Sequence, residues 1–383
     1  MNIRICVAIL ALLVSFGCRK TAPPAQAPAP PSAASPAPEL SHSAGGETAA
    51  PLPKYFKGSI GSSLDLQMKL VRTGDQLAGS YFYQKIGTRI DVRGNVDKDG
   101  NLTLEEFDKS GKQTGLFKGI WQIDATDGLV TLAGNWSKPA SEKGSDKRTA
   151  FSLHEEPIAF TGDVEMTTKQ IKESNKTLMY EISASYPQLS GGNPNFAKFN
   201  QVAQSLITKK VAGFKKDMAP AEGEEPRPEG SMASTLTAGY TVVLAQDDLV
   251  SIRFDIGSYY QGAAHPNSYS DVLNFDLKNG KQLKLADLFK PGSKYLQAIA
   301  TYSIAELKKQ GKEKGLTDEE IERGAAADAK NYQSWTITKR GLAIGFDSYQ
   351  VGPYAAGPQS VTVPYSTLKD LINPEGPIAQ LAK

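Results

Sequence analysis

The stretch Leu77-Ala78-Gly79-Ser80-Tyr81 places a glycine inside an alternating apolar segment, and Leu132-Ala133-Gly134-Asn135-Trp136 repeats this arrangement. Phe117-Lys118-Gly119-Ile120-Trp121 is a looser copy. Alternation with a period of two predicts half-buried strands. A glycine within a strand marks a bend or a close approach of two backbones, as the closure of a small barrel requires. These stretches therefore predict a closed β unit.

Short alternating segments surround these stretches at even spacing and are separated by turn residues such as Thr73-Gly74-Asp75 and Asp127-Gly128. The segments cover residues 55–60, 64–72, 77–83, 89–96, 102–107, 116–123, 129–136 and 149–153. About eight such strands predict an all-β domain, a small barrel or sandwich, over residues 54–156. Its aromatic residues either fill the barrel or line the mouth of a ligand site. They are Tyr81, Tyr83, Trp121 and Trp136.

The segment Asp97-Lys98-Asp99-Gly100-Asn101 has the acidic spacing of a calcium loop. An EF-hand needs glycine at its sixth position and glutamate at its twelfth, where this chain has Leu102 and Asp108. The segment also lies between two strand patterns. We therefore interpret it as a hairpin turn.

Residues 157–383 mix both kinds of pattern. Strand-like segments cover 178–186, 235–245, 249–260, 335–337, 342–346 and 360–363, and helical spacing begins at Phe196 and recurs at 296–307 and 318–327. These patterns predict an α+β domain with an antiparallel sheet and packed helices. We expect it to fold separately from residues 54–156, with the junction at Glu155-Glu156-Pro157.

The first residues are typical of a targeting signal. Arg4 precedes an apolar run that ends in Ser15-Phe16-Gly17-Cys18. This ending resembles the bacterial lipobox, which implies that residues 1–17 are a signal peptide and that Cys18 is lipidated. The alternative is cleavage by the ordinary signal peptidase, which leaves a soluble secreted protein. Residues 18–53 form a tether rich in alanine and proline.

These features predict a cell-envelope protein that faces the periplasm and is held at a membrane by its N-terminal lipid. Arg19 favours the outer membrane. The chain has 43 basic and 41 acidic side chains, which argues against a nucleic-acid partner. Cys6 and Cys18 are its two cysteines, so the mature chain forms no internal disulfide.

Two segments share one frame. Phe254-Asp255 and Phe346-Asp347 are each followed by seven residues and then by Ala-Ala-x-Pro. If the two strands are neighbours in one sheet, their loops form a single surface, which suits recognition because tyrosine offers large contact area at low entropic cost. The candidate binding residues are Tyr259, Tyr260, Gly262, His265, Tyr349 and Tyr354.

Residues Tyr259–Pro266 and Tyr349–Pro353, with the ending Val361-Thr362-Val363-Pro364-Tyr365, resemble a bacterial extracytoplasmic domain. That domain occurs in RsiV-type anti-sigma factors and beside the catalytic domain of PdaC-type peptidoglycan deacetylases. The resemblance covers about residues 175–375. In the RsiV family the domain binds lysozyme, so the resemblance implies recognition of a lysozyme-like hydrolase or of peptidoglycan.

Three functions follow from these patterns. The leading one is an envelope binding protein that uses the loops of residues 157–383. The second is a small-ligand carrier with its site in the β-barrel, and the third is a hydrolase centred on His265. His154 and His265 are the histidines of the expected folded units, and no metal-protease, nucleophile-elbow or P-loop motif is present. We therefore expect no catalytic residues, no metal and no cofactor.

Overall fold

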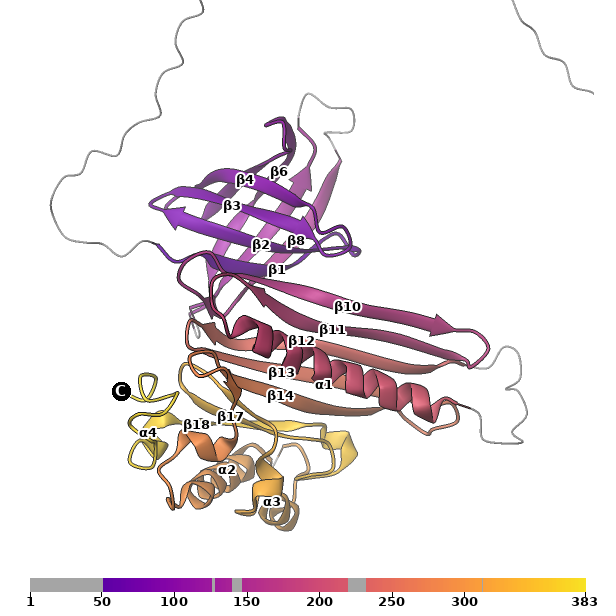
Figure 1. Cartoon of the computed structure of the whole chain (residues 1–383), viewed down its shortest axis with the longest axis vertical. Coiled ribbons are helices and arrows are strands. Elements are labelled where there is room, and N and C mark those ends of the chain that lie inside the picture. Colours follow the sequence, from indigo (N-terminus) through magenta and orange to yellow (C-terminus); the bar gives the residue numbers. More distant parts are fainter. Residues whose placement is uncertain (1–50, 126–127, 140–146, 220–231, 312) are drawn as a thin grey trace, which may run out of the picture. The chain divides into compact units, whose positions relative to one another are not determined.

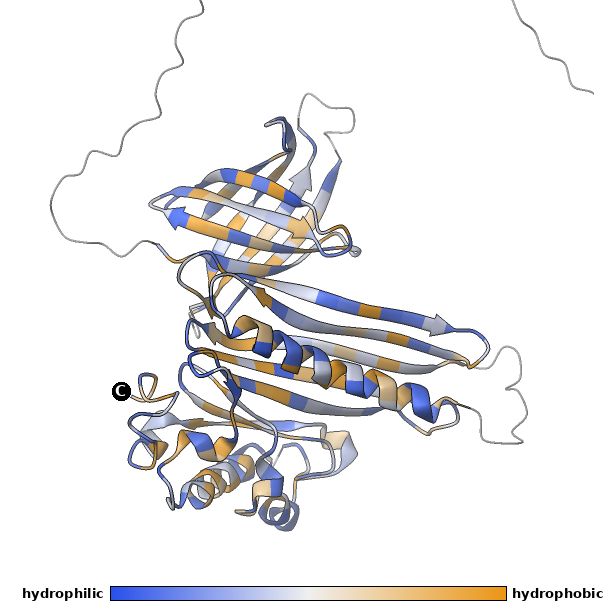
Figure 2. Ribbon diagram, viewed as in Figure 1, coloured by the Kyte–Doolittle hydropathy of each residue, from blue (hydrophilic) through white to orange (hydrophobic). Residues whose placement is uncertain are grey.

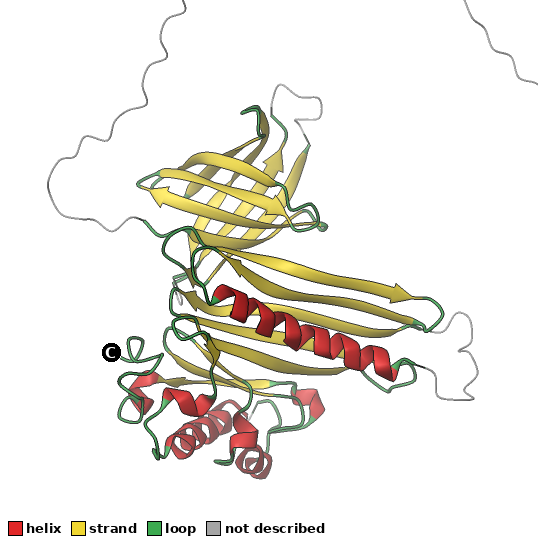
Figure 3. Cartoon of the chain, viewed as in Figure 1, coloured by secondary structure: helices red, strands yellow, loops and turns green. Residues whose placement is uncertain are grey.

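The computed structural model describes residues 51–125, 128–139, 147–219, 232–311 and 313–383. The predicted fold class is confirmed, because an all-β barrel precedes an α+β region (Figure 1 and Figure 3). The signal, Cys18 and the tether lie outside the described residues. In the described part of the chain, none of the helices is long and apolar enough to cross a membrane.

Eight antiparallel strands form the barrel, and β1 pairs with β8 to close it. The strands are β1 (Lys54–Ile60), β2 (Leu64–Thr73), β3 (Gln76–Tyr83), β4 (Arg89–Val96), β5 (Asn101–Phe107), β6 (Gln113–Ile123), β7 (Val130–Ser137) and β8 (Arg148–Glu156). All eight predicted strands are present, and each one lies within a few residues of its predicted bounds.

The glycines of the repeated motif lie where strands approach most closely, as the sequence predicts. Gly119 and Gly134 face each other across β6 and β7. A Cβ atom on Gly134 would lie 2.2 Å from the carbonyl oxygen of Lys118 and 2.5 Å from the Cα atom of Gly119. Because both obstacles are backbone, no side-chain rotation can make room.

The barrel interior is filled by aliphatic and aromatic side chains. Phe117 makes edge-to-face contacts with Tyr81 and Phe151, with ring centroids 5.7 and 5.1 Å apart. The buried carboxylate of Glu106 accepts hydrogen bonds from the Tyr81 hydroxyl at 2.6 Å and from Trp136 Nε1 at 3.0 Å. Of the four aromatic residues in question, Tyr81 and Trp121 are buried in the barrel core and help to fill it, whereas Tyr83 and Trp136 are partly buried and pack against that core.

The supposed calcium loop is a hairpin turn between β4 and β5, as predicted. One carboxylate oxygen of Asp97 accepts hydrogen bonds from the amides of Asp99 and Asn101, at 2.9 and 2.8 Å. These bonds turn the side chain back onto its own backbone, which is the ordinary role of aspartate at such a position.

A seven-stranded sheet follows, in the order β10–β11–β12–β13–β14–β15, with β9 beside β12. The sheet is mixed, whereas we predicted an antiparallel one, because β11 and β9 each run parallel to β12. Its strands are β9 (Ile158–Ala159), β10 (Glu165–Asn175), β11 (Tyr180–Ser190), β12 (Ser234–Gln246), β13 (Leu249–Tyr259), β14 (Asn267–Asp276) and β15 (Lys281–Gln282).

Helix α1 (Phe196–Asp217) lies along one face of this sheet (Figure 1). Figure 2 shows hydrophobic and hydrophilic residues alternating along it, and its buried residues recur at helical spacing. They are Phe196, Phe199, Ala203, Ile207, Val211 and Phe214. They pack on the side chains of β11 to β14 that point to the same face, including Phe254 and Phe275. The opposite face of the sheet is therefore free to contact other elements.

The C-terminal elements form a second core around a three-stranded sheet, ordered β16–β17–β18. They are α2 (Tyr295–Gly311), α3 (Asp318–Gly324), β16 (Trp335–Ile337), β17 (Gly341–Phe346), β18 (Gln359–Pro364) and α4 (Tyr365–Leu368), with short 3-10 turns at Leu285–Leu288, Ala329–Tyr332 and Tyr354–Ala356. Two buried contacts join the sheets. The amide of Ile337 donates to Ser251 Oγ at 2.9 Å, and Asn274 Nδ2 donates to the carbonyl of Trp335 at 2.8 Å.

Replacing Glu156 by glutamine is expected to increase the free energy of unfolding at pH 7. Burial raises the pKa of Glu156, and the nearby Lys57 offsets only part of this shift. A carboxyl group with a raised pKa in the folded state loses stability as the pH rises above its unfolded pKa of about 4.3. The gain of Glu156→Gln should therefore vanish below about pH 4. Urea unfolding at pH 7 and pH 4 measures both values, and an equal gain at both would contradict the argument.

Candidate functional site

The two predicted loops come from different sheets. The first connects β13 to β14 and the second connects β17 to β18. The condition that we set for a shared surface, that Phe254 and Phe346 lie on neighbouring strands of one sheet, is not met, because β13 belongs to the seven-stranded sheet and β17 to the three-stranded one. The loops nevertheless meet. Asp347 accepts hydrogen bonds from the amide of Ser270 at 3.1 Å and from its hydroxyl at 3.0 Å.

Three of the candidate residues form an aromatic cluster, His265, Tyr349 and Tyr354. The rings of His265 and Tyr354 stack with centroids 4.3 Å apart and planes at 26°. The Tyr349 ring lies 5.4 Å from that of Tyr354. The Tyr354 hydroxyl donates to the carbonyl of Pro266 at 3.1 Å, which ties the second loop to the first.

Tyr349 is largely accessible, with 62% of its surface exposed. Its backbone lies in the left-handed region, at φ 71°, which costs about 1–3 kcal/mol for a residue with a side chain. The turn is fixed by Gln350, whose amide nitrogen Nε2 donates to the carbonyls of Gly324 at 3.1 Å and Asn331 at 2.9 Å. The large aromatic ring of Tyr349 is thus exposed to solvent, and its backbone has an unfavourable conformation. Such conformations are frequent at binding sites.

The remaining candidates lie outside the aromatic cluster. The Tyr260 ring packs against Phe214 of α1 at 5.6 Å, and its hydroxyl donates to Asp217 at 3.0 Å. Burial raises the pKa of Tyr260. Tyr259 ends β13 opposite Thr235. Gly262 has a φ of 87° and supplies the turn of the loop. The surface therefore holds fewer of the candidates than we predicted.

The imidazole ring of His265 contacts the ring of Tyr354. It is exposed, and its Nδ1 lies 2.9 Å from the carbonyl oxygen of Pro266. Among the described residues no carboxylate is within hydrogen-bond distance of its ring, and no group of three or more His, Cys, Asp or Glu side chains could hold a metal ion. The geometry gives the hydrolase hypothesis neither a paired base nor a metal centre in the described part.

A polar groove of about 490 Å³ adjoins the cluster along both loops. It opens on the face of the seven-stranded sheet opposite to α1. Arg253 and Asp255 of β13 lie in it 3.1 Å apart, together with Asp347. Hydroxyl and amide side chains complete its lining, among them Thr237, Ser268, Ser270, Gln359 and Ser360. The groove offers both charges and many hydrogen-bonding groups.

The repeated Phe-Asp frame also indicates which side chains of the two strands are accessible. In each copy the phenylalanine is buried, Phe254 under α1 and Phe346 in the second core. The aspartate that follows each one lines the groove. Successive strand residues point to opposite faces, so the frame predicts two acidic side chains on accessible surface.

Two family models match the part of the chain that forms this site. Residues 171–268 match the family described as "Deacetylase PdaC", and residues 286–366 match the family described as "Protein of unknown function (DUF3298)". The first match contains the loop with His265, and the second contains Tyr349 and Tyr354. The candidate site thus forms where the two matched segments meet.

The chain is also similar to individual proteins. The chain is 26% identical over 211 residues to the peptidoglycan-N-acetylmuramic acid deacetylase PdaC of Bacillus subtilis, which covers 55% of this chain and 42% of that protein. The chain thus spans less than half of that relative's length. A solved DUF3298 structure from Bacteroides fragilis is 21% identical, with a TM-score of 0.43, and covers 58% of this chain and 98% of its own. One from Pseudomonas aeruginosa is 14% identical, with a TM-score of 0.38, and covers 55% and 94%.

Proposed function

We propose that this chain is a binding protein of the cell envelope whose aromatic cluster and polar groove recognise peptidoglycan, without catalysing a reaction. The observation that carries the proposal is the aromatic cluster of His265, Tyr349 and Tyr354, in which His265 and Tyr349 are exposed, beside a groove with two carboxylates and an arginine. The aromatic rings offer flat faces to the apolar side of a sugar ring, and the groove offers partners for hydroxyl and amide groups. The name of the Bacillus subtilis relative, a peptidoglycan deacetylase, supports this ligand class.

A second candidate partner is a lysozyme-like hydrolase. It is supported by the resemblance to the RsiV-type domain and by the exposure of Tyr349, since exposed aromatic anchors are frequent hot spots of protein interfaces. The two candidates use the same cluster, and separate titrations with a purified disaccharide-tetrapeptide and with hen lysozyme distinguish them.

Replacing Tyr349 by alanine should weaken the binding of the disaccharide-tetrapeptide by about 30-fold, which corresponds to ~2 kcal/mol. Stability should change little, because the side chain is mostly exposed. Isothermal titration calorimetry measures the affinity, and Ile123→Ala, at an exposed residue of the barrel, is the matched control. Unchanged affinity of the Tyr349 variant for both the disaccharide-tetrapeptide and lysozyme would exclude the cluster as the site.

We also propose that Cys18 anchors the protein to a membrane, preferably the outer one. The support is the lipobox-like Ser15-Phe16-Gly17-Cys18 sequence. Cys18→Ser should move the protein to the soluble fraction or leave it unprocessed. Fractionation of cell envelopes measures this, and a variant that is processed and still membrane-bound would disprove the anchor.

A further inference from the structure

A cavity of about 700 Å³ lies between the outer wall of the barrel and β10. One wall consists of outward-pointing barrel residues, including Gln67, Lys69 and Phe82, and the other consists of the consecutive β10 residues 165–170 together with Lys172. This volume lies within the range of about 300–1,000 Å³ that is typical of small-molecule binding sites. Phe82 contributes apolar surface.

The free edge of β10 faces this cavity. β10 is the first strand of its sheet and pairs only with β11. The backbone amide of Thr168 donates to the side-chain oxygen of Gln67 at 3.2 Å, so a barrel side chain occupies the position of a strand partner. In an antiparallel ladder every second residue points to the same edge. The amides of Gln170 and Lys172 therefore face the same side as that of Thr168.

The cavity carries an excess of positive charge. Five of its lining residues are cationic and two are acidic, although the whole chain has a net charge of only +2. The cationic residues are Lys69, Lys85, Arg89, Lys169 and Lys172, and the acidic ones are Glu156 and Glu165.

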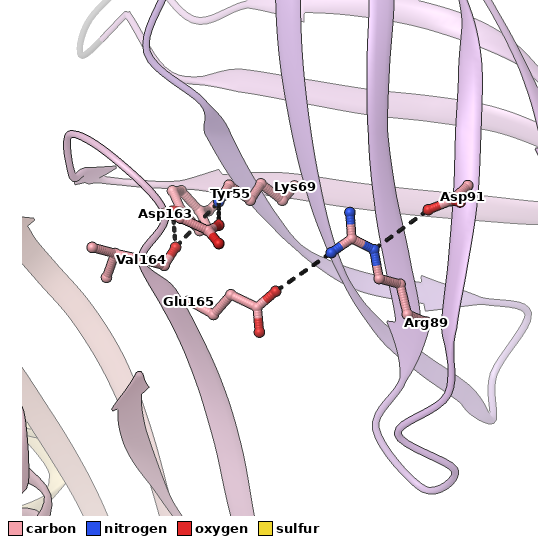
Figure 4. A network of polar contacts seen from close by, with 7 residues as sticks. All are labelled: Tyr55, Lys69, Arg89, Asp91, Asp163, Val164 and Glu165. Carbon is pink, nitrogen blue, oxygen red and sulfur yellow. Dashed lines mark hydrogen bonds and ion pairs between the residues drawn. The ribbon is translucent and has the colours of Figure 1, made fainter. Parts of the chain in front are cut away.

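The ion pairs at the rim are loose, and Figure 4 shows how they lie. Arg89 is 3.4 Å from Asp91 and 3.8 Å from Glu165, and all three side chains are more than half exposed. Lys69 is 3.5 Å from Asp163. Exposed pairs of this kind contribute about 0–1 kcal/mol. An incoming carboxylate can therefore replace the present partners of Arg89 at small cost. Lys69 is 25% exposed and also donates to the carbonyl oxygen of Val164 at 3.3 Å, so it can take the carboxylate as a further partner.

We propose that this cavity binds a short extended peptide with a free terminal carboxylate, which adds to β10 as a further strand. The peptide backbone pairs with the edge amides of β10, as in other cases of strand addition. Its carboxylate lies between Arg89 and Lys69, and one of its side chains contacts Phe82. The proposal does not depend on the loop site, which contains none of these residues.

The test uses the full chain and two probes, tetra-alanine with an N-terminal dansyl group and either a free or an amidated C-terminus. Fluorescence anisotropy should show the free acid binding at least ten times more tightly than the amide. The double variant Lys69→Gln/Arg89→Gln should bind both probes equally. Lys98→Gln/Lys118→Gln, which removes two charges from barrel residues that do not line the cavity, should keep the tenfold difference.

Hydrogen exchange tests the pairing itself. The bound acid should slow the exchange of β10 amides, those of Gln170 and Lys172 included. Gln170→Pro removes one edge amide at a position where proline is tolerated, and it should weaken binding at least tenfold, whereas Gln170→Ala should not. Equal affinity for acid and amide, no binding of the acid at millimolar concentration, or unchanged exchange in β10 would each overturn the proposal.

Discussion

Replacing Phe254 by alanine is expected to lower the free energy of unfolding by about 3–5 kcal/mol. The ring is completely buried between α1 and the seven-stranded sheet, where it lies 6.3 Å from the ring of Tyr240. Removing it deletes its apolar contacts and leaves a cavity in a close-packed core. Chemical denaturation of the full chain measures the loss.

Phe346→Ala should cause a loss of the same size, because this ring is 1% exposed and contacts Tyr332 in the second core, at 6.0 Å. Tyr349→Ala, three residues further along the chain, is the control and should cost less than 1 kcal/mol as a mostly exposed position. If Phe254→Ala unfolds at the same denaturant concentration as the unchanged protein, the ring does not hold β13 in place.

The barrel could be predicted strand by strand because its sequence repeats one simple rule. Each strand alternates between the filled interior and the outer wall, and each hairpin has its own turn residues, such as Asp97 with Gly100. The glycines within the strands made it possible to predict that the sheet closes into a barrel, which the alternation alone does not indicate. Local pattern was sufficient here because every strand pairs with its neighbour in sequence, apart from the closing pair of β1 with β8.

Four strands of the seven-stranded sheet were missed, the two-residue strands β9 and β15 and the long strands β10 and β14, and the two long ones were missed for physical reasons. β10 (Glu165–Asn175) is an edge strand with one buried residue, Met166, so it has little apolar alternation. β14 begins with Asn267-Ser268-Tyr269-Ser270, polar residues that border the groove. A strand is recognised in a sequence by alternating apolar residues. In β10 and β14 many of these positions are polar because they face solvent or a candidate site.

The partial success at the loops has a similar cause. The shared Phe-Asp frame reports that two strands end in similar loops, and the contact between His265 and Tyr354 agrees with this. The frame does not specify which strands pair. The two loops meet through Asp347 and Ser270, a contact between sheets that no spacing rule contains.

Replacing Gly134 by valine should cost more than about 3 kcal/mol, since overpacking of a core typically costs 1–3 kcal/mol and here the obstacle is backbone. The new Cβ would lie 2.2 Å from the Lys118 carbonyl oxygen, so β6 and β7 would have to separate. Gly239→Val is the matched control. Gly239 lies in β12 with nothing within 4 Å of its Cβ position, and a β-branched residue suits a strand.

The consequences of Gly134→Val should be confined to one part of the chain. If residues 54–156 fold separately, as we predict, circular dichroism will show the barrel unfolding at a lower temperature while the α+β part keeps its transition. The dansyl tetra-alanine acid should then lose its site, because Lys69 and Arg89 belong to the barrel. Binding at His265, Tyr349 and Tyr354 should persist. A single shared transition in the variant would instead show that the barrel and the α+β part unfold as one cooperative unit.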